Sequence, residues 1–317
     1  MQMTELQQND HEQMILFPAS EARLGKVGFI DQYGHCRLEF QYDSGRRFSH
    51  GMAAVLVGGK WGYIDAEGRL VIAPRFDRAG DFHEGAARVK VQGQVRYLDH
   101  KGNWLGSTTY EDGGDFAEGF APVKVEGAWG FINLKGEVVL APIFELAGCF
   151  CEGVANVVSE KKWGYIRPDG SYAIPPAFDE AERFSEGLAP VQIDDKWGYI
   201  GHEGRFRIER KFEAALNFSE DLGPVRVGSR WGYVDSSGAL VIAPKFFRAN
   251  RFSEGLAGVS LDGQDKCGYI DRRGRWVIQP KFDEVGDFTR GLAQVFIAGP
   301  LEAYIDSKGN VIWPQGN

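Results

Sequence analysis

The chain has 317 residues, and its 36 Lys and Arg against 44 Asp and Glu give a formal net charge of −8. This acidic balance argues against nonspecific binding to nucleic acid or to an anionic membrane, and no apolar run approaches the roughly 18 to 20 residues of a membrane-spanning helix. The 42 glycines and the 13% of aromatic residues are typical of many turns between short, aromatic-rich strands.

Residues 1–25 are expected to form an N-terminal tail or cap. The stretch from Met1 to Gln13 is polar and acidic, without the basic patch and apolar run of a signal peptide. The four scattered cysteines contain no C-x-x-C, and no histidine lies close in sequence to Cys149 and Cys151, which argues against a disulfide framework and a zinc site. We therefore expect reduced thiols, a cytoplasmic location and no metal or other cofactor.

From residue 26 onward, one pattern recurs about every 34 residues. Trp129, Trp163, Trp197 and Trp231 follow one another at this interval, and each precedes a Gly. A repeat of this length is one small module that shares its core with its neighbours. The pattern predicts about 8.5 units over residues 26–314, which start near residues 26, 60, 94, 128, 162, 196, 230 and 266, with a half unit at 300–314 and a tail at 315–317.

Each unit contains three short runs that we predict to be strands. In the unit that begins at residue 162, the runs are 162–166, 172–174 and 188–193. The third run alternates apolar and polar residues, and this period of two is typical of a half-buried strand. A D-x-x-G turn joins the first two runs, and a tight turn joins the third run to the first run of the next unit. The sequence therefore predicts an all-β fold of three-stranded antiparallel units.

The first run carries Trp, Gly and Tyr in succession, so the two rings lie on the same side of the strand. A module this small cannot bury an aromatic face alone, and we expect these rings to form the seam between stacked units. The Gly between them would leave room for another backbone or ring. The alternative is that exposed rings bind glycans or other cell-wall ligands.

A Glu precedes the third run in six units, and Gly follows it in five of them. One hypothesis is an acidic ladder that receives a basic protein partner. The other is a row of turn residues whose carboxylates accept local backbone N–H bonds. The unit at 94–127 is irregular, because Val95 and Arg96 replace Trp and Gly and Trp104 stands in its second run, so a local binding function is one candidate there. The candidate partner-binding residues are Glu84, Glu118, Glu152, Glu186, Glu220, Glu254, Arg96 and Trp104.

The recurring pattern K-W-G-Y-I-D…G…V-I-A-P-x-F-D…F-S-E-G-L-A-x-V resembles the WG-repeat family, which is found mostly in bacterial proteins. The resemblance covers about residues 26–314 and is specific because the pattern recurs in register. It implies a repeat scaffold and supplies no catalytic residues.

Stacked units can form an open, curved solenoid or close into a propeller-like toroid. We favour the open form, because the units are shorter than usual propeller blades and a terminal half unit could cap an open end. No zinc-protease motif, phosphate loop or Ser-His-Asp set stands out, so we expect no enzyme. The leading hypothesis is a protein-binding scaffold, and its specific version is an immunity-type protein that neutralises a basic toxin or effector. The sequence indicates no oligomeric state.

Overall fold

The computed structural model describes residues 15–261, 266–298 and 301–314. Within these ranges the regular structure is entirely β, with every strand pair antiparallel, which confirms the predicted fold class. The expected C-terminal tail and residues 1–14 of the expected N-terminal tail lie outside the described part of the chain.

The sheets share one design, in which four strands pair in chain order. In one unit they are β4 (Ser44–Gly45), β5 (Met52–Val57), β6 (Lys60–Asp65) and β7 (Leu70–Phe76). β5 is the third run of the sequence pattern, β6 is the first run and β7 is the second run. The short strand β4 comes from the link that precedes the third run.

The other strands occupy the same four places. Those in the place of β4 are β8 (Arg78–His83), β11 (Asp112–Gly113), β15 (Leu146–Cys151), β19 (Glu180–Ala181), β23 (Ala214–Ala215) and β30 (Glu284–Val285). The third runs are β1 (Phe17–Glu21), β9 (Ala86–Val91), β12 (Phe120–Val125), β16 (Val154–Ser159), β20 (Ala189–Ile193), β24 (Gly223–Val227), β27 (Leu256–Leu261) and β31 (Leu292–Ile297). The first runs are β2 (Lys26–Ile30), β10 (Gln94–Asp99), β13 (Ala128–Asn133), β17 (Lys162–Ile166), β21 (Lys196–Ile200), β25 (Arg230–Val234), β28 (Cys267–Asp271) and β32 (Leu301–Asp306). The second runs are β3 (Cys36–Tyr42), β14 (Val138–Phe144), β18 (Tyr172–Phe178), β22 (Phe206–Phe212), β26 (Leu240–Ala249), β29 (Trp276–Phe282) and β33 (Val311–Trp313).

A typical sheet contains the third run of one predicted unit followed by the first and second runs of the next predicted unit. A two-residue turn forces the third run to pair with the first run that follows it, whereas the longer link after the second run carries the chain into the next sheet. The predicted half unit is therefore a full sheet, because β31 pairs with β32 and β33. The described residues form eight sheets. The seven-stranded sheet contains two units, because β26 serves as the second run of one unit and continues as the inner strand of the next. The eight sheets therefore correspond to nine units.

Part of the expected N-terminal tail is a strand. β1 pairs with β2 in the register of the other third runs, and the side chains of Phe17 and Ala19 are buried. The sequence pattern hid this strand because only two inward residues of the run are apolar and Pro18 lies between them. Residues 17–21 are thus the third run of the first unit.

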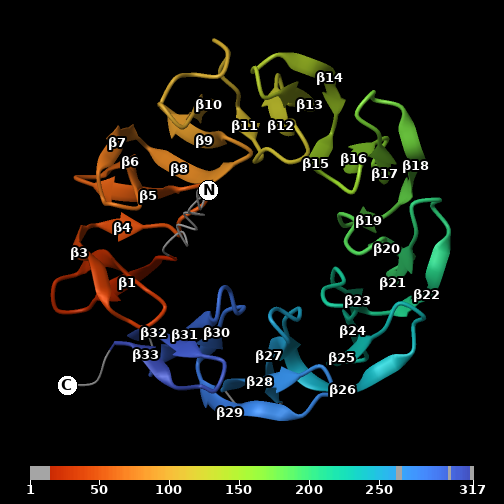
Figure 1. Ribbon diagram of the computed structural model, residues 1–317. Helices are drawn as coiled ribbons and strands as arrows, with labels where there is room; N and C mark the ends of the chain where they lie inside the picture. Colours follow the sequence, from red (N-terminus) through yellow and green to blue (C-terminus); the bar gives the residue numbers. More distant parts are fainter. Residues whose placement is uncertain (1–14, 262–265, 299–300, 315–317) are drawn as a thin grey trace, which may run out of the picture.

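The sheets follow one another around a ring, with second runs such as β18 and β22 at the circumference and β19, β23 and β30 toward the centre (Figure 1). The first and last sheets are in contact. The Tyr304 hydroxyl donates to the carbonyl of Pro18 at 2.8 Å, and the Phe40 and Trp313 rings stack with centroids 5.2 Å apart. The contact depends on β1, which gives the first sheet a face against which the last sheet is buried.

The ring that follows the Trp-Gly position of the first run is the centre of each core, and it is Tyr in all first runs except β2 and β13, where it is Phe29 and Phe131. Where it is Tyr, the ring is fully buried, as in Tyr63 and Tyr199, and its hydroxyl donates to a backbone carbonyl of the next unit 17 residues along the chain, as in the 2.9 Å bond from Tyr63 to Gly80. Burial raises the pKa of the Tyr63 hydroxyl well above its usual range. The expected aromatic seam is therefore present, with the Tyr rings inside it and the Trp rings half-buried at its edge.

The Gly of the Trp-Gly pair is required by the neighbouring outer strand. A Cβ atom at Gly62 would lie 2.5 Å from the carbonyl oxygen of Ile72, where the β6–β7 register shifts. No side chain fits at that distance, so the second run can lie this close only against Gly. The same close approach recurs at Gly28, Gly130, Gly164, Gly198, Gly232 and Gly268.

Candidate functional site

The six candidate glutamates lie in tight turns at the start of the third run. Each has a positive φ, between 50° and 55°, and the next residue also has a positive φ. A backbone pair closes each turn, as in the 2.9 Å bond from Ser185 N to Leu188 O. Gly is common at the second position because it adopts this conformation without steric cost.

The glutamate carboxylates link consecutive units. The two oxygens of Glu84 accept the backbone N–H groups of Glu118 and Gly119, both at 2.7 Å. The hydrogen-bond hypothesis is therefore correct in kind, but the donors belong to the next unit around the ring and are not local. The same link extends from Glu118, Glu152, Glu186, Glu220 and Glu254 to the next turn. A basic partner for this row stays a prediction.

Arg96 and Trp104 lie together at the edge of a core. The Arg96 guanidinium stands 3.8 Å from the centroid of the Trp104 ring, a cation–π contact. Trp104 also packs edge-on against Phe76 at 6.0 Å, and Trp276 packs against Phe246 in the same way at 6.1 Å. Trp104 therefore occupies a repeated packing position, and its role in partner binding stays a prediction.

Arg96 also explains why this unit is irregular. It stands where seven other units have Gly and the last unit has the small residue Ala303, and the chain after β10 forms only two isolated bridges, Val95 with Tyr110 and Leu98 with Trp104. The outer strand is thus lost where a large side chain occupies its space.

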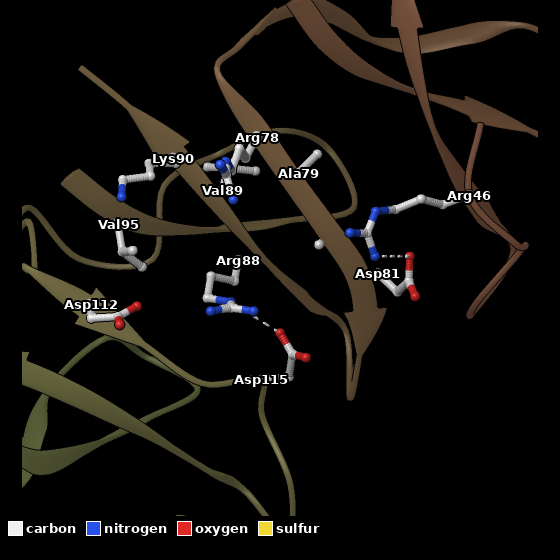
Figure 2. Close-up of a pocket in the computed structure, with 11 residues that line it drawn as sticks. Arg46, Arg78, Ala79, Asp81, Arg88, Val89, Lys90, Val95, Asp112 and Asp115 are labelled. Atoms are coloured by element: carbon white, nitrogen blue, oxygen red, sulfur yellow. Dashed lines mark ion pairs between the residues drawn. The ribbon is translucent and has the colours of Figure 1, made fainter. Parts of the chain in front are cut away.

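A pocket of about 230 Å³ lies beside the same unit (Figure 2). Val95 is on its wall, at the position of the repeated Trp. In a regular unit, the third-run residue Arg226 pairs with Trp231 and its guanidinium stands 5.9 Å from the centroid of the Trp231 ring. In the irregular unit, the equivalent third-run residue is Lys90, and it pairs with the much smaller Val95. Replacement of Trp by Val therefore leaves the pocket open. Its charged lining residues are Arg46, Arg78, Arg88, Lys90, Asp81, Asp112 and Asp115.

Ion pairs cross this pocket. Arg88 Nε is 3.3 Å from Asp115 Oδ1, and Arg46 Nη1 is 3.6 Å from Asp81 Oδ1 (Figure 2). Arg88 also donates to the carbonyl of Gly113. Both carboxylate oxygens are buried without a hydrogen bond of good geometry. The pocket offers charge and hydrogen bonding to a ligand, and nowhere in the described ranges do three or more His, Cys, Asp or Glu side chains gather in a way that could hold a metal ion.

A second pocket of about 310 Å³ has the same origin. Cys267 stands in the Trp position of its unit and lines this pocket together with Arg248, which corresponds to Arg78 of the first pocket. Burial raises the pKa of the Cys267 thiol, so the group is a poor nucleophile. The sequence signal for both pockets is the loss of the repeated Trp, for which we had considered a local binding function only at Val95.

Comparison with known proteins adds a family and a fold. A family model described as "WG containing repeat" matches the chain eight times, at residues 28–61, 61–94, 96–127, 129–163, 163–197, 197–231, 231–264 and 268–299. No curated protein matches. No helix that could cross a membrane occurs in the described ranges.

Solved structures resemble the whole ring. A crystal structure titled as the eukaryotic initiation factor matches with a TM-score of 0.66 and 12% identity, over 94% of this chain and 95% of that chain. The C-terminal WD40 domain of Sif2 matches with a TM-score of 0.45 and 11% identity, over 81% and 93%. Apo AztD from Citrobacter koseri matches with a TM-score of 0.46 and 14% identity, over 80% and 90%. The first match shows a shared fold over nearly the whole chain.

Proposed function

Because the chain belongs to the family of WG containing repeats, we propose that it is a non-catalytic scaffold that binds a protein partner. The observation that supports this proposal most directly is an apolar surface on the outer strand β14. Exposed apolar surface on a folded protein is typical of an interaction site.

The surface consists of Val138, Val139 and Ile143 on β14 and Leu146 at the start of β15. Ile143 is 71% exposed, and the other three side chains are between 41% and 50% exposed. Val139 and Ile143 face the same side of the strand, since side chains of a strand alternate. We call these four residues the β14 patch.

Ile143 distinguishes this patch from the other outer strands, whereas the positions of Val138 and Val139 are also apolar and exposed on β7 and β26. Four other outer strands carry a cation at the position of Ile143, and each cation lies 5.0 to 5.3 Å from the centroid of the adjacent Phe ring; they are Arg75, Lys211, Lys245 and Lys281. The repeat therefore normally covers this Phe with a charged residue, and Ile143 exchanges that charge for apolar surface. A complementary apolar surface of a protein is the partner that fits.

The glycan alternative is less well supported by the geometry. A sugar platform needs ring faces open to solvent, but the repeated Tyr rings are fully buried and the repeated Trp rings are half-buried. The neutralising version of the proposal, in which the partner is a basic toxin or effector, depends on the net charge of −8 and on the acidic row.

The test compares two substitutions on outer strands. Ile143→Lys introduces the residue type that other units carry, and Val277→Lys is the matched control on β29, where Val277 is 46% exposed. Capture from the native host, with identification by mass spectrometry and then titration of the purified partner, should show that Ile143→Lys loses the partner and Val277→Lys retains it. Equal affinity of both variants would exclude the β14 patch, and the absence of any partner would contradict the scaffold proposal.

We also propose that the ring is closed in solution. The proposal is supported by the core that joins β1 to β32, in which Phe17 and Tyr304 have ring centroids 5.6 Å apart. Small-angle scattering should give a compact ring profile, and Phe17→Asp should increase the radius of gyration because it places a charge in this core. An extended, rod-like profile of the natural protein would exclude closure.

A further inference from the structure

The row of glutamate carboxylates is interrupted where the two ends of the chain meet. His50 and Arg290 occupy the glutamate position in their turns, with φ of 50° and 52°. Carboxylates are thus replaced by basic or neutral side chains in this part of the ring. The interruption leaves two described turns, at residues 50–51 and 84–85, without the carboxylate partner that the other turns have, and the first of them lies beside a pocket.

That turn is formed by His50 and Gly51, and its backbone matches the turns that hold a carboxylate. Its φ values are 50° and 81°, against 53° and 85° for Glu118 and Gly119. Ser49 and Met52 close it with backbone bonds of 2.8 and 3.1 Å, as the flanking residues do in the other turns. The two N–H groups therefore have the conformation in which Glu118 and Gly119, two units further along, bind both oxygens of Glu84.

Among the described residues, no carboxylate reaches this turn. Within residues 15–261, 266–298 and 301–314, neither the His50 N–H nor the Gly51 N–H has a hydrogen-bond acceptor. Two adjacent donors of this kind form a site for an anion.

A pocket of about 100 Å³ surrounds the turn and combines charge with apolar surface. Arg47 and Arg290 line it, and neither forms an ion pair with any described residue. Leu16 and Phe17 line it as well, and both are almost fully buried. The pocket therefore places positive charge and a carboxylate-binding turn directly beside an apolar wall.

We propose that the His50–Gly51 turn, together with Arg47 and Arg290, binds the C-terminal carboxylate of a peptide whose last side chain is apolar. The two N–H groups would take the two oxygens, as the equivalent groups do in three turns of this molecule, and the arginines add charge. A terminal residue carries a carboxylate and a side chain on one Cα atom, so a single residue can fill both halves of the pocket. The site lies on different strands from the β14 patch, and its test is independent of the partner proposed there.

The probe is an acetylated Ala-Ala-Ala-Leu peptide with a free carboxylate, added to the isotope-labelled full-length protein. The amide resonances of His50 and Gly51 should shift in proportion to binding. The same peptide with a C-terminal amide should bind about tenfold more weakly or not at all, because a charged acceptor is lost. Equal binding of acid and amide, or no shift at millimolar acid, would overturn the proposal.

A third peptide, with an internal Glu and an amidated end, distinguishes the source of the carboxylate. If it binds as tightly as the free acid, the assignment to a chain terminus is wrong. Arg290→Ala should weaken binding of the free acid by about tenfold, whereas Arg273→Ala, a matched change at an exposed arginine of another turn, should leave it unchanged. Unaltered binding to Arg290→Ala would likewise contradict the site.

Discussion

Two neighbouring units of the ring show what the Trp-Gly pair contributes. In the unit of β4 to β7, Trp61 packs at the edge of the core, and Gly62 allows β7 to approach within the distance that excludes a Cβ atom. In the next unit, Val95 and Arg96 stand at the same two positions, the outer run forms only isolated bridges, and a pocket opens beside Val95.

The contrast separates the roles of the two residues. A small residue at the Gly position lets the outer strand pair, since the backbone of that strand occupies the space of a larger side chain; Ala303 in the last unit also permits pairing. Trp determines whether the space between units is filled, since both pockets described above have a smaller residue in its position. The buried Tyr that follows is kept in both units, as Tyr63 and Tyr97, and it maintains the ring where the outer strand is lost.

The largest effect is expected from Gly62→Val. The new side chain would collide with the backbone of β7, and we expect a loss of about 3 kcal/mol in the free energy of unfolding. Arg96→Val is the matched control, because that unit has no outer strand to displace, and it should cost less than about 1 kcal/mol. Denaturant unfolding measures both, and equal losses would show that the close approach is not what requires Gly.

A smaller loss should follow from Trp231→Val, which reproduces the side chain of Val95 in a regular unit. Trp231 is half-buried, so removal of the indole should cost about 2 kcal/mol, and it also removes the contact with Arg226. A crystal structure of the variant should show a pocket like that beside Val95. A collapsed site without a pocket would mean that the irregular unit owes its pocket to something other than the missing ring.

The glutamate row provides a third contrast, between occupied and interrupted parts of the ring. Glu186→Ala removes the acceptor for the N–H groups of Glu220 and Asp221 and should cost about 1 kcal/mol. His50 occupies the equivalent position in its own turn but forms no such bonds to the next turn. His50→Ala should therefore change the free energy of unfolding by less than about 0.5 kcal/mol. If thermal unfolding shows equal effects, the carboxylates do not join the units.

The smallest effect is expected from the Asp of the D-x-x-G turn, which is Asp65 in the regular unit and Asp99 in the irregular unit. Burial opposes ionisation of Asp65 and Asp99, but hydrogen bonds from Arg69 and Asn103 outweigh it and hold the pKa of each carboxyl below its usual range. A carboxyl with a lowered pKa stabilises the fold above its unfolded pKa, near about 4, and this stability is lost as the pH falls through the folded value.

Asp65→Asn combined with Asp99→Asn should therefore reduce the loss of stability between about pH 5 and pH 3, because Asn keeps the acceptor without the proton equilibrium. Asn133 already serves in the equivalent turn, where its Oδ1 accepts from Lys135 N at 2.9 Å. Unfolding curves over this pH range measure the effect. An unchanged acid response would place the titrating groups elsewhere.

The strands and turns follow from the sequence because their causes are local. Alternation over five or six residues places one face in a core, Asp and Gly close the turns, and a two-residue connection leaves antiparallel pairing as the only geometry. The tandem array and the antiparallel strands could therefore be predicted, as could the aromatic seam. The Gly of the Trp-Gly pair was likewise expected to admit a close neighbour, and Gly62 does.

Only the tertiary structure shows which unit each repeated side chain contacts. The glutamates look like local turn residues in the sequence, but the curvature of the ring places the next turn within reach of each carboxylate. Contact between β1 and β32, and the pocket left where an indole is absent, also depend on how separate sheets pack. Contacts across such distances follow from the angle between successive sheets, which no pattern within a single repeat specifies.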